Sequence, residues 1–461
     1  MLDDTVCPQV VPVTLSLKEQ MVSFLDQMLA VSSFELVPAA KRRPGRPASF
    51  SLNHLWLALL IGILSQADGL RRVWRSMVME PMGSFPMLTV TYEAVRSRLF
   101  AAGTASLQEF FVLISAHLQR VLSCEQVSAL SLASFAPQVV ALDESTLDQL
   151  KRLTDDLATV PDKDPHLQPG KLAGLFDLRL QQWVRLQFRA DVPAGCNVGI
   201  LELLSGLARG SLILADLGYF SFPWFDYLTE QGFFWISRLK ERTSYTVQQI
   251  FYQDKDRGVL DALIWLGAYR ADRAAYPVRL VQYQLAGKTY SYLTNVLDPA
   301  QLSMLEIAQL YARRWDIELA FLTLKREVGL ALWWGAKQEI VLIQLWLALI
   351  LAQILQALRL QIALQAGVEP FDVSMHLLVE LLCTTSAQGT ALVPLLVERG
   401  RFLGLIRPSR RKLIGVPARE PEHICSLFDG APAPRHARYA GRNPHGPRKP
   451  FHPRFTSHFL L

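Results

Sequence analysis

Apolar residues recur three and four positions apart through roughly the first 130 residues of the chain. This spacing is typical of α-helices that bury one face. The predicted helices are residues 14–31, 51–64, 91–103 and 106–122. We therefore expect residues 1–130 to form a helical N-terminal region.

Beyond residue 135 the pattern changes to short apolar runs, which predict buried β-strands. The predicted strands are residues 138–142, 171–178, 183–190, 211–215 and 232–239. The second and third of these should form a hairpin, and helices are expected at 197–208 and 222–231. The predicted order of elements is three strands, a helix, a strand, a helix and a strand. This is the order found in an RNase H-like domain. The predicted fold class is therefore α/β, with a mixed sheet that carries helices on its faces.

Residues 241–300 form a mixed segment, in which two further strands are predicted at 278–285 and 290–297. A long helix then begins around Ser303 or Leu305. The expected domains are the N-terminal region (1–130), the RNase H-like domain (135–365), a C-terminal helical region (366–429) and a basic, proline-rich tail (430–461).

Composition favours a globular protein that lies outside membranes. Of the 461 residues, 51% are apolar and 19% are charged. The apolar run at 341–360 is long enough for a bilayer, but it contains three glutamines and an arginine, so a buried helix is the better interpretation. The run at 55–64 is too short to span.

Cysteine usage and the N-terminus favour a cytoplasmic protein. The five cysteines are scattered, odd in number and without a CxxC pair, which disfavours a disulfide framework or a zinc site. The first ten residues are acidic and lack the apolar core of a signal peptide.

The excess positive charge is concentrated in the tail. The net charge is +6, and residues 430–461 carry six Lys and Arg with no Asp or Glu. Such a tail should be extended or disordered and could act as an arm for a polyanion; an ordinary solvated tail is the alternative. The basic linker 41–47 and the pair Arg96 and Arg98 could likewise contact DNA, although a solvated helix face explains the pair equally well.

Three carboxylates stand at positions that the predicted topology would bring together. Asp143 and Asp216 each follow an apolar strand, and Glu318 lies within the long helix. An Asp after a strand is often only a turn former or an N-cap. Three acids at one sheet edge, however, suit two Mg²⁺ ions about 4 Å apart, which can activate water and stabilise a leaving oxygen. Glu144 and Asp148 could replace Asp143 as a ligand.

The long helix carries a narrow polar stripe. At 100° per residue, Tyr311, Arg314, Glu318 and Lys325 fall within roughly 60° of one another, while Asp316 lies on the far side. The flanking apolar residues, expected to pack the helix onto the sheet, are Trp315, Phe321 and Leu322. A structural salt bridge between Arg314 and Glu318, four residues apart, is the alternative interpretation.

This spacing resembles a known signature. The segment "YARRWDIELAFLTLK" is similar to the Y-R-E-K signature of DDE transposases from bacterial insertion sequences. The segments "VVALDEST" and "LILADLGYFSF" resemble the first and second Asp blocks of that family. The strands "FFWISRLK" and "YLTNVLD" resemble those that precede its signature helix, and the similarity covers about residues 135–360.

The resemblance implies an RNase H-like catalytic core with a β-rich insertion at about 241–300. It also implies cut-and-paste transposition by metal-dependent cleavage and strand transfer. The implied metal-binding triad is Asp143, Asp216 and Glu318, and the implied contacts to transposon-end phosphates are Tyr311, Arg314 and Lys325. Two Mg²⁺ ions would be bound, with Mn²⁺ able to substitute. Trp265 is a candidate to stack a flipped base, with a core aromatic as the alternative.

The implied partners are double-stranded DNA, as terminal inverted repeats and as target, and a second copy of the chain in a synaptic dimer. The implied location is the bacterial cytoplasm, at the nucleoid. An RNase H-like nuclease, or an inactive DNA-binding derivative, would share the fold. A helical DNA-binding regulator would leave both strand-end aspartates unexplained.

Overall fold

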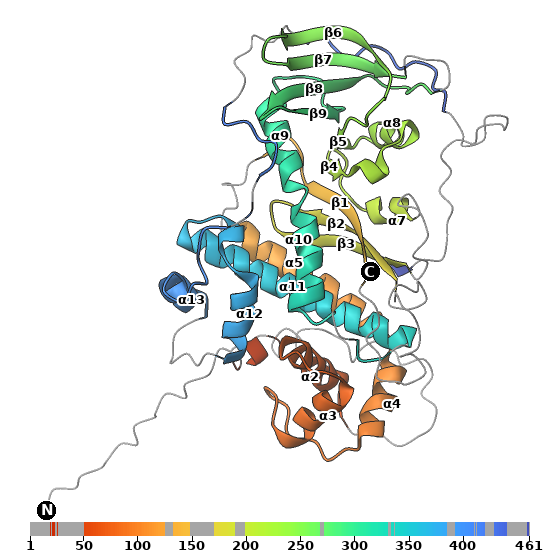
Figure 1. Cartoon of the computed structure of the whole chain (residues 1–461). Coiled ribbons are helices and arrows are strands. Elements are labelled where there is room, and N and C mark those ends of the chain that lie inside the picture. The colour runs from red at the N-terminus through yellow and green to blue at the C-terminus, as the bar shows by residue number, and fades with distance from the viewer. Residues whose placement is uncertain are drawn as a thin grey trace, which may run out of the picture. The chain divides into compact units, whose positions relative to one another are not determined.

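The chain forms two compact units in the computed structural model (Figure 1). The helical unit comprises residues 1–122 and 323–410, and the sheet unit comprises residues 123–322 and 411–461. The structure describes residues 19, 21–23, 25, 50–124, 132–147, 170–189, 199–267, 272–330, 333–335, 337–384, 392–409, 411, 413–419, 428–439 and 459–460.

The sheet unit is built on one mixed sheet of ten strands. The strands are β1 (Val139–Thr146), β2 (Lys171–Asp177), β3 (Gln182–Arg189), β4 (Leu212–Ala215), β5 (Phe234–Arg238), β6 (Tyr245–Asp254), β7 (Val259–Leu266), β8 (Val278–Leu285), β9 (Lys288–Thr294) and β10 (Phe459–Leu460). Their order across the sheet is β10-β3-β2-β1-β4-β5-β9-β8-β7-β6.

The core of this sheet has RNase H-like topology. β1 pairs antiparallel with β2 and parallel with β4, and β4 pairs parallel with β5. The helices of this unit are α7 (Ile200–Leu204), the short turn η4 (Leu217–Tyr219), α8 (Phe222–Glu230), α9 (Met304–Arg313) and α10 (Asp316–Leu322). The strand order 3-2-1-4-5, with helices α7 and α8 between the strands they were expected to join, confirms the predicted fold class.

The insertion contains four strands, whereas the sequence predicted two. β6 to β9 form an antiparallel meander that continues the core sheet through the pairing of β5 with β9. Inside the meander, Arg279 of β8 donates to Asp261 of β7 through Nε (2.7 Å) and Nη2 (2.6 Å). Arg279 also donates to the carbonyl of Leu302, just before α9. This buried ion pair therefore ties the meander to the start of α9.

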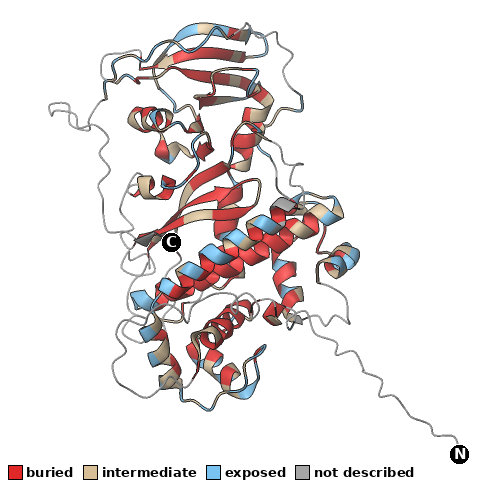
Figure 2. Cartoon of the chain, turned by 180° about the vertical axis from the view of Figure 1, so that it is seen from behind, coloured by how far each residue is buried: buried red, intermediate tan, exposed pale blue. Residues whose placement is uncertain are grey.

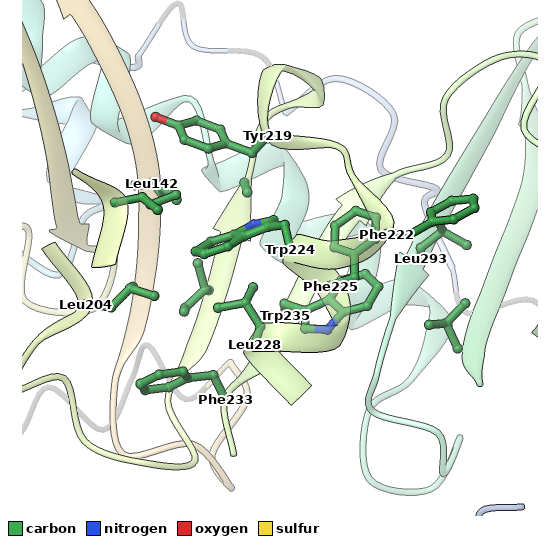
Figure 3. Close-up of a cluster of buried hydrophobic side chains, with 14 of the residues drawn as sticks. Leu142, Leu204, Tyr219, Phe222, Trp224, Phe225, Leu228, Phe233, Trp235 and Leu293 are labelled. Atoms are coloured by element: carbon green, nitrogen blue, oxygen red, sulfur yellow. The ribbon is translucent and has the colours of Figure 1, made fainter. Parts of the chain in front are cut away.

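An aromatic core fills one face of the sheet (Figure 3). Phe225 of α8 stacks on Trp235 of β5 with ring centroids 4.2 Å apart, and Trp224 is fully buried beside them. Leu142 of β1 belongs to the same cluster. Because neighbouring residues of a strand point to opposite faces, Asp143 is directed to the other face of the sheet.

The helical unit contains α2 (Leu52–Leu64), α3 (Leu70–Met79), α4 (Tyr92–Ala102), α5 (Ala105–Cys124), the π-helical turn η5 (Thr323–Glu327), α11 (Gln338–Ala366), the turn η6 (Pro370–Asp372), α12 (Met375–Thr384) and α13 (Leu392–Gly400). The sequence did not predict α3. The predicted helices at 51–64, 91–103 and 106–122 are confirmed, while the helix predicted at 14–31 lies largely outside the described residues.

The long apolar helix α11 is a core helix, as predicted for residues 341–360. By length and composition it could cross a membrane, yet its most apolar window is entirely buried within the structure (Figure 2). Trp346 packs edge-on against Phe111 of α5, and Gln353 donates to Ser115 of the same helix at 3.0 Å. The amide of Gln353 is thus hydrogen-bonded inside the protein, as buried polar groups ordinarily are.

Candidate active site

Asp143 lies within β1 and not after its end. The strand predicted to end at Leu142 continues to Thr146, because the hairpin partner β2 keeps pairing with it through Lys171. Asp143 stands opposite Gly174, and its Oδ1 accepts the backbone N–H of Glu144 at 2.8 Å. One carboxylate oxygen of Asp143 is thereby fixed by the backbone, and Oδ2 remains for other partners.

Glu144, one of the two alternatives to Asp143, is engaged elsewhere. Its carboxylate pairs with Lys171 at 3.0 Å and with Arg189 at 3.4 Å. This is the expected result of strand alternation, which turns adjacent side chains to opposite faces. The other alternative, Asp148, lies outside the described residues.

Asp216 follows β4 directly, as predicted. The parallel register pairs Leu142 with Ala215, so Asp143 and Asp216 are the next residues on neighbouring strands. Asp216 also precedes the short turn η4, and its side chain is 46% exposed. Two carboxylates therefore stand side by side on the sheet, one well covered and one open to solvent.

The helix that carries Glu318 begins as predicted but is not continuous. Ser303 is the N-cap of α9, and its Oγ accepts the N–H of Glu306 at 3.2 Å. α9 ends at Arg313, and α10 starts at Asp316. Between them the N–H of Arg314 bonds to the carbonyl of Tyr311, three residues back, as in a 3₁₀ turn.

This junction corrects the predicted stripe. A uniform 100° per residue does not hold across residues 314–315, nor through the π-helical turn η5 that contains Lys325. Trp315 is 53% exposed and Leu322 is also exposed, so neither packs the helix onto the sheet as expected. Phe321 does, with its ring 4.9 Å from that of Trp183 on β3.

The packing of α10 on the sheet depends on a glycine. Trp183 lies over Gly174, where an added Cβ would come within 2.8 Å of the indole ring. Since Gly174 is the partner of Asp143 across the β1–β2 ladder, the indole and the aspartate share one face of the sheet. Trp183 then supports Phe321, and α10 is held beside β1.

All three acids of the predicted triad meet at the guanidinium of Arg314. Its Nη1 lies 3.0 Å from Oδ2 of Asp143, and its Nη2 lies 2.9 Å from Oε1 of Glu318. Nη2 is also 4.0 Å from Oδ1 of Asp216. The salt bridge between Arg314 and Glu318, which the sequence offered as an alternative interpretation, is therefore present. It is one contact within a cluster of four residues, which are Asp143, Asp216, Arg314 and Glu318.

The cluster perturbs the ionisation of its members. Burial raises the pKa of Asp143 to about 6, although the nearby Arg314 acts to lower it. Burial lowers the pKa of Arg314, but Tyr311, Asp143, Asp216 and Glu318 raise it more, and the net shift is upward. Arg314, only 5% exposed, is thus a firmly charged cation among three carboxylates.

Residues 171–354 match the family model of the transposase DDE domain. This part of the chain is similar to a transposase DDE domain. The matched range includes Asp216, Arg314 and Glu318, while Asp143 lies ahead of it.

Among solved structures, the chain is similar to a piggyBac transposase in a synaptic complex with hairpin DNA, at 11% identity and a TM-score of 0.37. That alignment covers 79% of this chain and 78% of the other. A likeness at this level carries no information about the function. A search of curated proteins found no match.

Tyr311 and Lys325 both lie within the matched range but belong to different units. Tyr311 is buried, its hydroxyl donates to the carbonyl of Ala215 at 3.4 Å, and burial raises its pKa. Its ring lies 5.0 Å from Tyr292 of β9. Lys325 is half-buried on η5, which belongs to the helical unit.

Asp316 is a site neighbour that the sequence did not reveal. It is buried, and it accepts hydrogen bonds from Gln181 at 3.2 Å and from Arg411. The predicted stripe placed it on the far side of the helix, where an acid would ordinarily be solvated. Its adjacency to the buried Ile317 is a weak local signal, and the partner Arg411 is too distant in sequence to be inferred.

The described part of the tail is extended, as expected, but it is bound to the insertion. We call residues 428–439 the strap. Arg435 donates to the carbonyls of Leu266 and Ala274, and its guanidinium lies 4.5 Å from the ring centre of Trp265. Tyr439 donates to Asp226 of α8 at 2.8 Å. One face of Trp265, the candidate base-stacking residue, is therefore covered by an arginine.

The donor chemistry of the triad suits a divalent metal. Carboxylate oxygens are the ligands that Mg²⁺ and Mn²⁺ prefer. Within the described residues, however, no group of three acids, histidines or cysteines is arranged to hold an ion as it stands. The guanidinium of Arg314 contacts all three carboxylates instead, which marks the place as one that favours positive charge.

Proposed function

We propose that the protein is an active transposase that cleaves DNA at the ends of an insertion sequence and joins the freed ends to target DNA. The supporting observation is the convergence of Asp143, Asp216 and Glu318 on one cationic group, from two neighbouring strands and a helix. The transposase DDE domain match over residues 171–354 supports the same class of activity.

In this proposal the three carboxylates hold two Mg²⁺ ions, for which Mn²⁺ can substitute. When bound, these ions would activate the attacking water or hydroxyl and stabilise the leaving oxygen of the phosphodiester. The N–H of Glu144 fixes Oδ1 of Asp143, and Oδ2, which pairs with Arg314, would be the oxygen that turns to an ion. Asp216 and Glu318, both partly exposed, supply the ligands nearest to an incoming DNA strand.

Tyr311, Arg314 and Lys325 are proposed to hold phosphates of the transposon end. Arginine suits this role because its planar fork can pair with two phosphate oxygens at once. Tyr311 is buried against Ala215, so any contribution from its hydroxyl requires a shift of α9 relative to β4. Lys325, as a flexible ammonium, would act as a point charge.

The helical N-terminal region offers a second surface for DNA. Arg71 of α3 lies over the ring of Tyr92 at 5.2 Å, and Arg96 and Lys337 both lie over the ring of Phe100. Tyr92, Arg96 and Phe100 are spaced four residues apart on α4, so they form one stripe about 12 Å long. Cations alternating with aromatic rings along such a stripe suit a phosphate backbone.

The expected partners are the terminal inverted repeats of the element, target duplex DNA and a second copy of the chain. Two ends must be brought together for transposition, which is why we propose a homodimer on paired ends. We place the reaction in the bacterial cytoplasm, at the nucleoid, on the basis of the scattered cysteines and the family resemblance.

The decisive experiment gives purified protein Mg²⁺ or Mn²⁺ and a duplex carrying the terminal repeat of its own element. We expect nicking at the repeat, exposure of a 3′-hydroxyl and its joining to a second duplex without ATP. Asp143→Ala, Asp216→Ala and Glu318→Ala should each abolish both steps and leave end binding largely intact. Glu230→Ala, which removes an exposed acid at the end of α8, is the matched control.

Product sequencing separates the alternatives. Cuts scattered without regard to the repeat, with no joined products, would identify a general nuclease. Specific end binding without cleavage under any metal would identify an inactive derivative. An Asp143→Ala protein that still cuts at the normal rate would remove Asp143 from the triad.

A further inference from the structure

We propose that Arg314 is a stand-in cation that holds the three acids of the triad in place and withholds them from metal until DNA phosphates draw its guanidinium away. This inference rests on the proposed metal-binding role of the triad. It adds that metal binding and DNA binding are coupled, and that Arg314 is the positioning residue that couples them.

The contacts show what a metal ion would have to displace. Asp143 has both oxygens engaged, Oδ1 by the N–H of Glu144 and Oδ2 by Nη1 of Arg314. Glu318 offers Oε1 to Nη2 of the same guanidinium at 2.9 Å. An ion that binds between Asp143 and Glu318 therefore competes directly with Arg314 for the same oxygens.

Charge balance points the same way. Three carboxylates and one guanidinium leave a net charge of −2 when all are ionised, which one divalent ion can neutralise. The two ions of the proposed reaction bring +4, and the guanidinium adds to that excess if it stays. If the guanidinium moves toward a DNA phosphate, the repulsion between it and the two ions falls. The phosphate also gives the arginine a bidentate partner equivalent to the carboxylates.

Arg314 lies where the backbone departs from regular helical geometry. It stands at the junction of α9 and α10, where its N–H and the N–H of Ile317 make three-residue bonds instead of the regular helical ones. Its Nε is buried and has no hydrogen-bond partner within the described part of the chain, so the present pose leaves one donor unsatisfied.

The rings on either side keep the guanidinium near the site if it leaves the acids. It lies 5.5 Å from the ring centre of Trp315 and 6.0 Å from that of Tyr311. Trp315 is the solvent-facing member of the pair, at 53% exposed. A guanidinium that moves toward Trp315 remains stabilised by the ring and becomes accessible to a DNA strand.

The test measures Mn²⁺ affinity directly, by calorimetry and by electron paramagnetic resonance of free Mn²⁺, on the full chain. Without DNA, Arg314→Gln should bind Mn²⁺ at least about tenfold more tightly than the unmodified protein, because charge-assisted hydrogen bonds no longer compete. Arg313→Gln removes the same charge from the neighbouring residue and should leave the affinity unchanged.

The same titrations are then repeated in the presence of a duplex that carries the terminal repeat. The repeat should tighten Mn²⁺ binding by the unmodified protein, and Mn²⁺ should tighten binding of the repeat by the same factor. In Arg314→Gln this mutual effect should largely disappear. If Arg314→Gln folds poorly, Arg314→Lys serves instead: one ammonium cannot bridge Asp143 and Glu318 together, so its Mn²⁺ affinity should be intermediate.

Equal or weaker Mn²⁺ binding by folded Arg314→Gln would overturn the inference, as would an unchanged DNA effect in that variant. Neither result would affect the proposed transposase activity, which the cleavage assay tests separately. Conversely, a protein that binds no Mn²⁺ with or without DNA would contradict the proposed metal-dependent function and this inference together.

Discussion

Replacing Asp261 with alanine should lower the free energy of unfolding of the sheet unit by about 3–5 kcal/mol. Asp261 and Arg279 form an ion pair whose side chains are both 0% exposed. Removal of one partner leaves a buried charge without compensation, and this penalty exceeds the loss of the contact itself.

The geometry predicts a loss of unfolding free energy at the high end of the range for one buried ion pair. Arg279 makes two bonds to the carboxylate, at 2.7 and 2.6 Å, and a third to the carbonyl of Leu302. For a unit of this size, such a loss corresponds to a fall in melting temperature of roughly 6–20 °C. Because Leu302 precedes α9, the same change should also weaken cleavage by loosening the helix that leads to Glu318.

Urea unfolding followed by circular dichroism gives the magnitude, and the double variant Asp261→Leu with Arg279→Met is the control. Replacing both partners by apolar residues of similar size should recover most of the loss, since no buried charge remains. A loss below about 1 kcal/mol for Asp261→Ala would refute the reasoning, because it would mean that Arg279 finds water or another partner.

Two further predictions concern DNA. The combined variant Arg96→Ala and Lys337→Ala should reduce the salt dependence of duplex binding by nearly one unit of logarithmic slope per lost phosphate contact. An unchanged slope in a titration from low to moderate salt would show that this surface does not bind DNA phosphates. Deletion from Gly430 should reduce non-specific DNA affinity more than end-specific affinity, and it should also lower the melting temperature because the strap is lost. Tyr439→Phe, which keeps the tail charge, should reproduce only the loss of stability, about 1.5–3 kcal/mol for a bond to a carboxylate.

The strands of the core sheet were predicted where burial on both faces leaves an apolar run in the sequence, whereas β6 and β7 of the insertion were missed. β4 is an uninterrupted apolar run that stops before Asp216, and the structure ends the strand at Ala215. β1 was predicted too short because its second half, which contains Asp143, is polar. Pairing with β2 sustains that half of the strand, and pairing partners are not visible in a local pattern.

The site itself was less accessible to sequence reasoning. A periodic pattern assumes regular geometry, and the 3₁₀-like junction at Arg314 and the π-helical turn after Leu322 both break it. The bond between Arg411 and Asp316 joins positions almost a hundred residues apart. The helix α3 was not predicted, although its buried residues Leu70, Val73 and Met77 have helical spacing.

The continuity of the core sheet and the insertion has a consequence for the order of folding. The pairing of β5 with β9 joins Ile236 to Thr294, 58 residues apart along the chain. The entropy of closing a loop grows with its length, so the adjacent antiparallel pairs from β6 to β9 are the easier contacts to make first. Once the meander has formed, the free stretch between β5 and β9 is much shorter. Docking of β9 then brings α9 and α10 toward β1, which makes assembly of the carboxylate cluster a late event of folding.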